Sequence, residues 1–319
     1  MTKLIVIVGI TGQKGGSVAR FFSSLSDWKI RGLTRNPSSP SSLHWTSLGV
    51  EIIAADLSCP STLASAFSGA TAIFSTTDFW GPFYDPSTPA LLKDGENLAQ
   101  FYKEAEKMQG VNVADAASKI VGLERLVVSA LCHAEEGSVG IYRNVAHWDG
   151  KAEAVKYLKE TYPGLAEKTT VVVVGNYMEN WMMDIKLRKQ TDGSFRLALV
   201  GSGKTPQPHI SIADDLGSVV HAALLTPPGK IILAARSMLS YTLQLQIWCE
   251  ANQVLFGSFD ELSVDMFEKF FSSSRTRKEF GEMMAFIDEF GYAGIGRSCC
   301  LSSFEEFVKK QDWSKQLNA

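Results

Sequence analysis

The stretch LIVIVGITGQKGG, from Leu4 to Gly16, constrains the fold more than any other part of the chain. Its first five residues are all aliphatic, which is typical of a strand that is buried on both faces of a parallel sheet. Glycines follow at positions 9, 12 and 15, and an apolar helical pattern begins near Ser17. A strand, a glycine-rich turn and a helix in this order predict a dinucleotide-binding turn.

Each glycine of this turn has its own predicted role. Gly9 allows the chain to leave the strand in a tight turn, and Gly12 lets the backbone approach a pyrophosphate without a Cβ atom. Gly15 allows the helix to pack closely on the sheet. The helix N-terminus offers unpaired N–H groups to the phosphates, so Thr11 and Gln13 are also expected to contact the cofactor. The alternative is a turn with a purely structural role.

The end of the second predicted strand, residues 29–34, indicates which dinucleotide binds. Enzymes that prefer NAD place an acidic residue about twenty positions beyond the glycine turn, where it binds the ribose 2′-hydroxyl. This chain has Arg35 there. Its guanidinium can stack on adenine and pair with a 2′-phosphate, which predicts a preference for NADP(H). Asn36 opens a Ser/Pro-rich loop with further phosphate donors, and a solvated loop arginine is the alternative.

The next two predicted strands end in further candidate residues. The third, residues 50–54, precedes Asp56 and Leu57, which we expect near the adenine. The fourth, residues 71–76, ends in Thr76 and Thr77, which should line the cofactor cleft because parallel strands present their carboxyl ends to ligands. An aromatic segment follows and supplies the substrate candidates Phe79, Trp80 and Phe83. Such aromatics can also simply cover the core.

Candidate catalytic residues follow the fifth predicted strand, residues 125–129. Ser129 lies at its end, and a helix beginning near Asn144 contains His147 and Lys151. These two positions are four residues apart, so both side chains lie on one helical face. Lys151 could hold the nicotinamide ribose or act as an acid or base. His147 could donate a proton, since an ordinary imidazole titrates near pH ~6.5. Two solvated side chains are the alternative.

The sixth predicted strand, residues 169–174, leads to a loop with three candidates. We expect Asn176 to contact the cofactor, and Tyr177 and Trp181 to line the substrate pocket. Farther on, the pair Asp214-Asp215 could suggest metal or acid/base chemistry, but capping of the following helix explains it better. No metal site is therefore expected. The chain after Ala251 is predicted to be helical.

Composition and charge exclude several classes of protein. The net charge of -3 over 319 residues gives no reason to expect nucleic-acid binding. Five cysteines, an odd number without CxxC spacing, favour a reducing compartment. No apolar run approaches the ~20 residues of a membrane span, and the first strand leaves no room for a signal peptide. These features predict a cytoplasmic protein, with shuttling to the nucleus if it is a regulator. They leave its oligomeric state open.

Several motifs together resemble one known family over nearly the whole length. They are GITGQKGGSVAR, TRNP, the SAL segment at Ser129, HWDGK, GNYMENW and ISIADDLG. In combination they are similar to the NmrA-like group of atypical short-chain dehydrogenases, in which the GxxGxxG spacing is usual. The resemblance implies a Rossmann-type doubly wound parallel sheet with a smaller α+β C-terminal lobe, and NADP(H) binding by the glycine turn and Arg35. We expect the Rossmann domain over 1–180, with a later segment near 208–235 returning to it, and the lobe over 181–319.

The resemblance allows two functions. One is an NADPH-dependent oxidoreductase acting on a small, aromatic or conjugated carbonyl or enone compound. The alternative is a non-catalytic sensor of NADPH and NADP⁺ that acts through a regulatory protein partner, since some members are thought to bind dinucleotide without turnover. Short-chain dehydrogenases carry Tyr-xxx-Lys where this chain has His147 and Lys151. That departure motivates the regulator, whereas the complete cofactor apparatus favours the enzyme.

Overall fold

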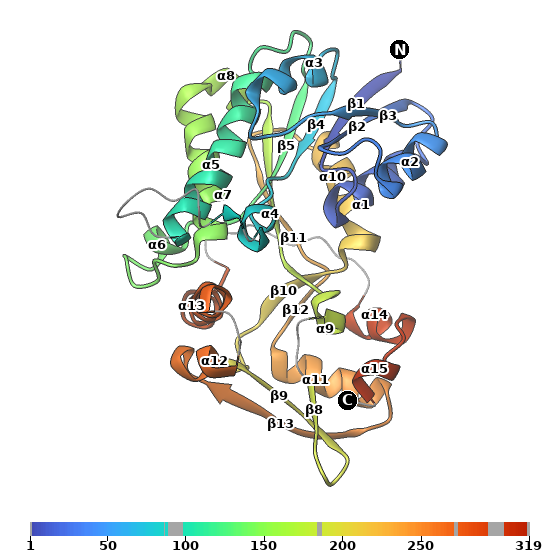
Figure 1. Cartoon of the computed structure of the whole chain (residues 1–319). Coiled ribbons are helices and arrows are strands. Elements are labelled where there is room, and N and C mark those ends of the chain that lie inside the picture. Colours follow the sequence, from blue (N-terminus) through green and yellow to red (C-terminus); the bar gives the residue numbers. More distant parts are fainter. Residues whose placement is uncertain are drawn as a thin grey trace. The chain divides into compact units, whose positions relative to one another are not determined.

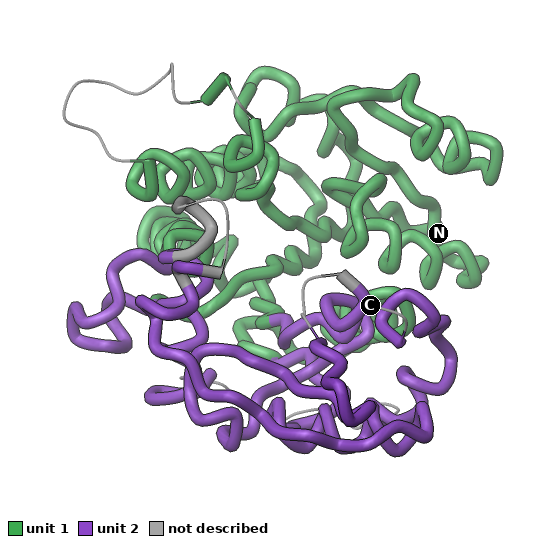
Figure 2. Tube along the Cα trace, turned by 60° about the horizontal axis from the view of Figure 1, so that its bottom comes forward, with its two compact units in different colours: residues 1–133, 146–173, 212–232 green, residues 134–145, 174–211, 233–319 purple. Residues whose placement is uncertain are grey.

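The computed structural model describes residues 2–85, 87–88, 98–183, 187–270, 274–292 and 303–317. The chain divides into two compact units, which Figure 2 shows in different colours. Unit 1 consists of residues 1–133, 146–173 and 212–232, and unit 2 of residues 134–145, 174–211 and 233–319. The segment 212–232 of unit 1 lies within the region near 208–235 that we expected to return to the first domain. Residues 134–145 and 174–180, which we assigned to the first domain, belong to unit 2.

A seven-stranded sheet with the order β11-β6-β5-β4-β1-β2-β3 forms the centre of the fold. Neighbouring strands from β6 to β3 are parallel, which confirms the doubly wound Rossmann-type prediction. The strand order reverses between β1 and β4, and ligands of such sheets bind at this switch point, outside the carboxyl ends of the strands. The strands are β1 (Lys3–Val8), β2 (Trp28–Thr34), β3 (Glu51–Ala54), β4 (Ala72–Ser75), β5 (Arg125–Ala130), β6 (Thr169–Val174) and β11 (Ile231–Ala234).

Helices cover both faces of this sheet (Figure 1). On one side α5 (Leu98–Ala117) lies against α7 (Ala146–Thr161), and on the other α1 (Gln13–Phe22) lies against α10 (Ile212–Leu225). The aliphatic strands supply the core, since Ile5, Val6 and Ile7 have no exposed surface. The shorter helices of unit 1 are α2 (Pro40–Ser47), η1 (Pro60–Thr62), α3 (Leu63–Phe67), α4 (Trp80–Tyr84) and α8 (Pro163–Ala166).

Two glycines allow α5 and α7 to approach closely. A Cβ atom on Gly110 would lie 2.4 Å from the Ala154 Cβ, and one on Gly150 would lie 2.7 Å from the Lys103 carbonyl oxygen. Side chains larger than hydrogen would push the two helices apart. The close contact brings the buried face of α5, which includes Glu106, within reach of Lys151 on α7.

Among its described residues, unit 2 contains two three-stranded sheets and its own aromatic core. The first sheet joins β7 (Asn176–Tyr177), β10 (Gln207–Ile210) and β12 (Ser237–Leu239), and the second joins β8 (Leu187–Lys189), β9 (Ser194–Val200) and β13 (Leu255–Leu262). The core includes Trp181, Phe195 and Trp248. The helices are α6 (Ala134–Gly137), α9 (Asn180–Met183), α11 (Tyr241–Ala251), α12 (Val264–Phe270), α13 (Ser274–Phe290), α14 (Phe304–Lys310) and α15 (Ser314–Leu317).

Three expectations about local structure were wrong. The chain after Ala251 is not all helical, because β13 pairs in parallel with the distant β9. Helix α10 begins at Ile212, so Asp214 and Asp215 lie in its first turn and do not cap it. Their negative charges still interact favourably with the positive end of the helix dipole. Helix α1 begins at Gln13, four residues earlier than predicted. Leucine and phenylalanine at near-helical spacing also predict a helix over residues 89–109, which lies partly outside the described residues.

Candidate functional site

The glycine turn has the geometry that its spacing predicts. Gly9 has a φ of +68°, in the left-handed region that favours glycine, and its carbonyl accepts a hydrogen bond from the Gly12 amide at 2.9 Å. A Cβ atom on Gly15 would lie 2.2 Å from the Gly9 carbonyl oxygen. Exposed residues Thr11, Gly12 and Gln13 surround the start of α1, where Gly12 is the N-cap without a capping side chain. A phosphate fits this exposed helix end, because the first amides of a helix need acceptors.

Arg35 lies exposed at the carboxyl end of β2 and already has an acidic partner. Its Nη2 donates to Oδ2 of Asp78 at 2.8 Å, and Oδ1 of Asp78 accepts from the Gly81 amide at 2.9 Å. A 2′-phosphate at this position would therefore compete with Asp78 for the guanidinium. The neighbouring Asn36 is exposed, and its Oδ1 accepts from the Ser38 amide at 3.1 Å.

The two adenine candidates follow β3, half-buried. Oδ1 of Asp56 accepts from the Ser58 amide at 2.8 Å, which fixes the turn. The Leu57 carbonyl accepts from Nδ2 of Asn112 at 2.7 Å, so a side chain from α5 holds this loop. Both residues thus lie just after a parallel strand, and their contact with adenine stays a prediction.

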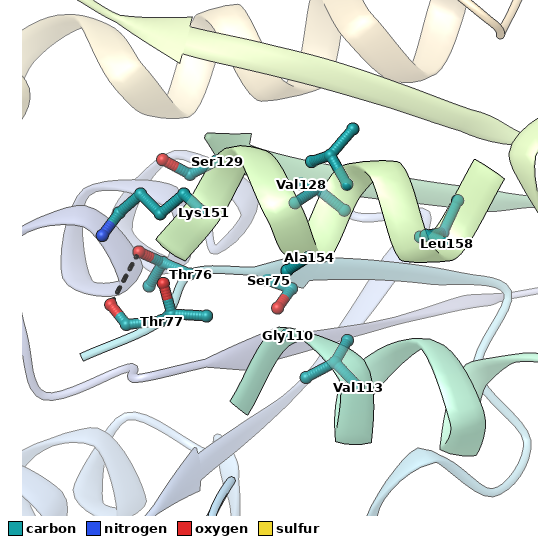
Figure 3. A pocket seen from close by; sticks show the side chains of 11 residues that line it. Ser75, Thr76, Thr77, Gly110, Val113, Val128, Ser129, Lys151, Ala154 and Leu158 are labelled. Carbon is teal, nitrogen blue, oxygen red and sulfur yellow. Dashed lines mark hydrogen bonds between the residues drawn. The ribbon is translucent and has the colours of Figure 1, made fainter. Parts of the chain in front are cut away.

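A pocket at the carboxyl ends of β4 and β5 brings four predicted residues together (Figure 3). Thr76, Thr77, Ser129 and Lys151 gather at its polar end, whereas Val113 and Leu158 line the other end. They come from the loop after β4, from β5 and from α7, far apart in the sequence. The predicted cofactor threonines and two of the three predicted catalytic residues therefore share one site.

Glu106 of α5 holds the Lys151 side chain in this pocket. Oε1 of Glu106 accepts from Nζ of Lys151 and also from Oγ1 of Thr77, the latter at 2.7 Å. Glu106 has no exposed surface and Lys151 is 8% exposed, so the ion pair is buried. Oε2 of Glu106 has no hydrogen-bond partner among the described residues. Loss of either the buried ammonium or the buried carboxylate would be strongly destabilising, because the remaining charge would be desolvated without compensation.

Sequence reasoning missed Glu106, although a signal was present. Glu106 follows Tyr102 by four residues and precedes Gln109 by three, so all three share the buried side of α5. A carboxylate is rarely buried without a partner. A charged residue within a buried helical stripe therefore predicts a cation on a neighbouring element.

A second cation, Lys14, lies beside Ser129. Nζ of the half-buried Lys14 donates to Oγ of Ser129 at 2.9 Å, and Ser129 is only 2% exposed. Burial lowers the pKa of Lys14 to about 8, while the negative charge of Glu106 partly opposes that shift. Lys14 was not among the predicted site residues, although its place inside the glycine turn was visible in the sequence.

His147 lies among aromatic rings and does not line the pocket that contains Lys151. Its ring centroid is 5.6 Å from that of Phe79 and 5.2 Å from that of Trp80, and His147 is 8% exposed. Phe79 and Phe83 are 2% and 5% exposed and pack with Tyr102, which fits the alternative that they cover the core. Trp80 is half-buried against this cluster. Four residues, about 6 Å along the helix axis, separate His147 from Lys151, and the two side chains have different surroundings.

The remaining candidates belong to unit 2. Nδ2 of Asn176 donates to Oε1 of Gln207 at 2.8 Å, and the adjacent Tyr177 is half-buried. Trp181 is fully buried, and its Nε1 donates to Oε1 of Gln244 at 2.9 Å. Nε2 of Gln244 in turn lies 2.7 Å from Nε2 of His209, and burial lowers the pKa of His209 to about 3. Within unit 2, Trp181 thus belongs to a buried hydrogen-bonded network with Gln244 and His209.

The described part of the chain shows neither a metal centre nor a membrane helix. No group of His, Cys, Asp or Glu side chains among these residues could hold a metal ion. No helix in the same ranges is long and apolar enough to cross a membrane.

The doubly wound sheet and the glycine turn that leads into α1 define a protein of Rossmann type. The model of the NmrA-like family matches residues 1–315. The chain therefore belongs to the NmrA-like family, as the motifs suggested.

Curated relatives carry the same family name. The NmrA-like family domain-containing oxidoreductase ptmS of Penicillium ochrochloron is 26% identical over 253 residues, which cover 75% of this chain and 69% of ptmS. The corresponding oxidoreductase hkm9 of Aspergillus hancockii is 28% identical over 237 residues, which cover 71% of this chain and 64% of hkm9. This chain thus spans about two thirds of the length of these relatives.

Solved structures share the fold at low sequence identity. NmrA, described as a negative transcriptional regulator, has a TM-score of 0.74 at 16% identity, covering 97% of this chain and 95% of NmrA. The NADPH-dependent quinone oxidoreductase QOR2 of Escherichia coli, complexed with NADPH, has a TM-score of 0.70 at 16% identity, covering 95% and 98%. The fold therefore occurs both in a regulator and in an enzyme.

Proposed function

We propose that this protein binds NADP(H) and uses it to reduce a small, aromatic or conjugated carbonyl or enone compound. The observation that carries the proposal is the buried pair of Lys151 and Glu106, which holds an ammonium at the carboxyl ends of β4 and β5 beside Ser129. Relatives support it, since ptmS and hkm9 are named oxidoreductases. NmrA has been solved with NADP and with NAD, and QOR2 with NADPH.

We assign different residues of unit 1 to different parts of the dinucleotide. The amides at the start of α1, around Gly12, are aimed at the pyrophosphate, and Arg35 is the partner for the 2′-phosphate. Asp56 and Leu57 flank the adenine side, and Thr76 and Thr77 lie at the switch point. When bound, NADPH supplies a hydride to the substrate carbon.

The role that we assign to Lys151 is orientation. Its ammonium can donate to a ribose hydroxyl while Glu106 keeps its position and its charge. The Thr77 hydroxyl donates to the same carboxylate oxygen, so Thr77 holds Glu106 and Glu106 in turn holds the Lys151 ammonium. A donor held in this way loses little entropy when it binds its ligand, which favours a productive ribose orientation.

Replacing Arg35 by alanine is expected to weaken NADPH binding about tenfold and to leave NADH binding nearly unchanged. The reason is that only NADPH carries the 2′-phosphate that the guanidinium would bind. Calorimetric titration of the purified protein with NADPH and NADH measures both affinities. Asp78→Asn is the matched control, and it should strengthen NADPH binding because it removes the competing carboxylate. If the wild-type protein binds both dinucleotides equally, the assignment of Arg35 is wrong.

Reductase activity is tested with a panel of quinones and enones, followed by NADPH oxidation. We expect turnover by the wild-type protein and a loss of about 100-fold or more in kcat for Lys151→Met. Lys151→Met alone leaves the buried Glu106 carboxylate without a cation. The role of Lys151 is therefore measured by comparing Glu106→Gln with the double variant Glu106→Gln/Lys151→Met. Equal turnover in this pair would exclude a role for Lys151 in orientation.

The alternative function is a redox-sensing regulator with a protein partner. It is favoured by His147, which replaces the usual tyrosine and packs against Phe79 and Trp80. A sensor must differ in conformation between its NADPH-bound and NADP⁺-bound states. If no compound of the panel is reduced, and hydrogen exchange differs between the two bound states, the regulator replaces the enzyme as our proposal.

A further inference from the structure

Lys14 occupies an unusual place in the glycine turn. It is the second residue of α1, between Gly12 and Gly15, and its side chain reaches Oγ of Ser129 on β5 at 2.9 Å. Strand β4 lies between β1 and β5 in the sheet. The Lys14 side chain therefore crosses the carboxyl end of β4, where Thr76 and Thr77 begin the next loop. This position joins the proposed phosphate site to the polar end of the pocket.

Electrostatics make Lys14 suitable for proton transfer. Its pKa of about 8 arises from burial, which disfavours the ammonium, against the attraction of the Glu106 carboxylate. An amine that titrates near this pH is mostly protonated at neutral pH and still releases its proton readily. Lys151 has a different environment, because the Glu106 carboxylate accepts a hydrogen bond directly from its Nζ.

The other proton donor suggested by the sequence is less well placed. His147 is in contact with the rings of Phe79 and Trp80, whereas the pocket is lined by Thr77, Ser129 and Lys151. The Lys14 ammonium is hydrogen-bonded to one of these lining residues. A carbonyl oxygen could take the place of Lys14 as the hydrogen-bond partner of Ser129, or bind beside Ser129. In either position it would lie next to the N–H groups of the Lys14 ammonium.

We propose that Lys14 donates the proton in the reduction, a role that rests on the proposed function. The substrate carbonyl carbon gains a hydride from the bound reduced dinucleotide, which is thereby oxidised. As the electrons of the C=O double bond move to oxygen, an N–H bond of Lys14 breaks and an O–H bond forms. The product is an alcohol, or the enol when the hydride adds to the far carbon of an enone. The neutral amine then takes a proton from water.

The first test does not need a substrate. Oxidised nicotinamide carries a positive charge that the reduced ring lacks, so NADP⁺ should displace protons from a nearby ammonium more than NADPH does. Calorimetry at pH 8 in two buffers of different ionisation enthalpy measures protons released on binding. We expect greater release with NADP⁺ than with NADPH in the wild-type protein, and no such difference in Lys14→Met. Lys29→Met, at an exposed lysine, is the matched control and should keep the difference.

The second test uses the reduction itself. With saturating NADPH, wild-type turnover should fall as the pH rises above about 8, because the donor must be protonated. Lys14→Met should lose about 100-fold in kcat together with this pH dependence. Lys14→Arg keeps the charge but holds its proton too tightly to donate it, so it should not restore turnover.

The outcomes separate the two proposals. If compounds are reduced but Lys14→Met keeps both kcat and the pH dependence, the role of Lys14 is overturned and the reductase stands. If His147→Phe abolishes the redox-dependent proton release and Lys14→Met does not, the donor is His147. If no variant or wild-type protein reduces any compound, the proposed function fails and the donor role of Lys14 fails with it.

Discussion

Glu106→Ala is expected to lower the free energy of unfolding by about 3 to 5 kcal/mol. The substitution leaves the Lys151 ammonium, which is 8% exposed, without the carboxylate that neutralises it. It also removes the acceptor of the Thr77 hydroxyl and opens a cavity between α5 and α7. Urea denaturation at pH 7, followed by circular dichroism, measures the change.

A double variant distinguishes the buried charge from the lost volume. Glu106→Leu/Lys151→Met replaces both charges by apolar groups of similar size, and such replacements are often close to neutral in stability. We expect it to be markedly more stable than Glu106→Ala. If the double variant loses as much stability as the single variants Glu106→Leu and Lys151→Met lose when summed, the ion pair is not coupled and its proposed role in fixing Lys151 fails.

Gly15→Ala is expected to weaken NADPH binding by about 100-fold or more, and also to lower the free energy of unfolding by more than about 2 kcal/mol. The added Cβ atom would lie 2.2 Å from the Gly9 carbonyl oxygen and 2.9 Å from the Ile10 Cα. Both atoms belong to the backbone, so the start of α1 must move away from the strand. Calorimetric titration and urea denaturation of the same preparation measure the two effects.

Gly12→Ala provides the comparison for this prediction. Its Cβ atom would meet only the Gly9 carbonyl oxygen, at 3.4 Å, on an exposed part of the turn with an ordinary φ of -88°. Stability should therefore change little, whereas NADPH binding should weaken because the Cβ atom occupies the approach of the pyrophosphate. Unchanged NADPH affinity in Gly12→Ala would show that the turn is structural only.

The prediction of the sheet succeeded because its signals are local or follow from the rules of parallel sheets. A run of aliphatic residues followed by glycines at positions 9, 12 and 15 fixes a strand and a turn with few neighbours involved. Since parallel strands end at the same edge, residues after β2, β4 and β5 could be assigned to that edge from the sequence. Pairing of β13 with β9 was missed because strand propensity at residues 255–262 is decided by a distant partner.

The sequence by itself determined the fold class, the glycine turn and the placing of Arg35 after one strand, of Ser129 at the end of another and of Lys151 on a helix. Only the tertiary structure decided the partners of these residues, which are Asp78, Lys14 and Glu106 respectively. Those partners are 43, 115 and 45 residues away along the chain. Helix rotation and close helix contacts decide which side chains meet over such separations. At Gly110 and Gly150 the distance between α5 and α7 is set by packing and not by a local sequence pattern.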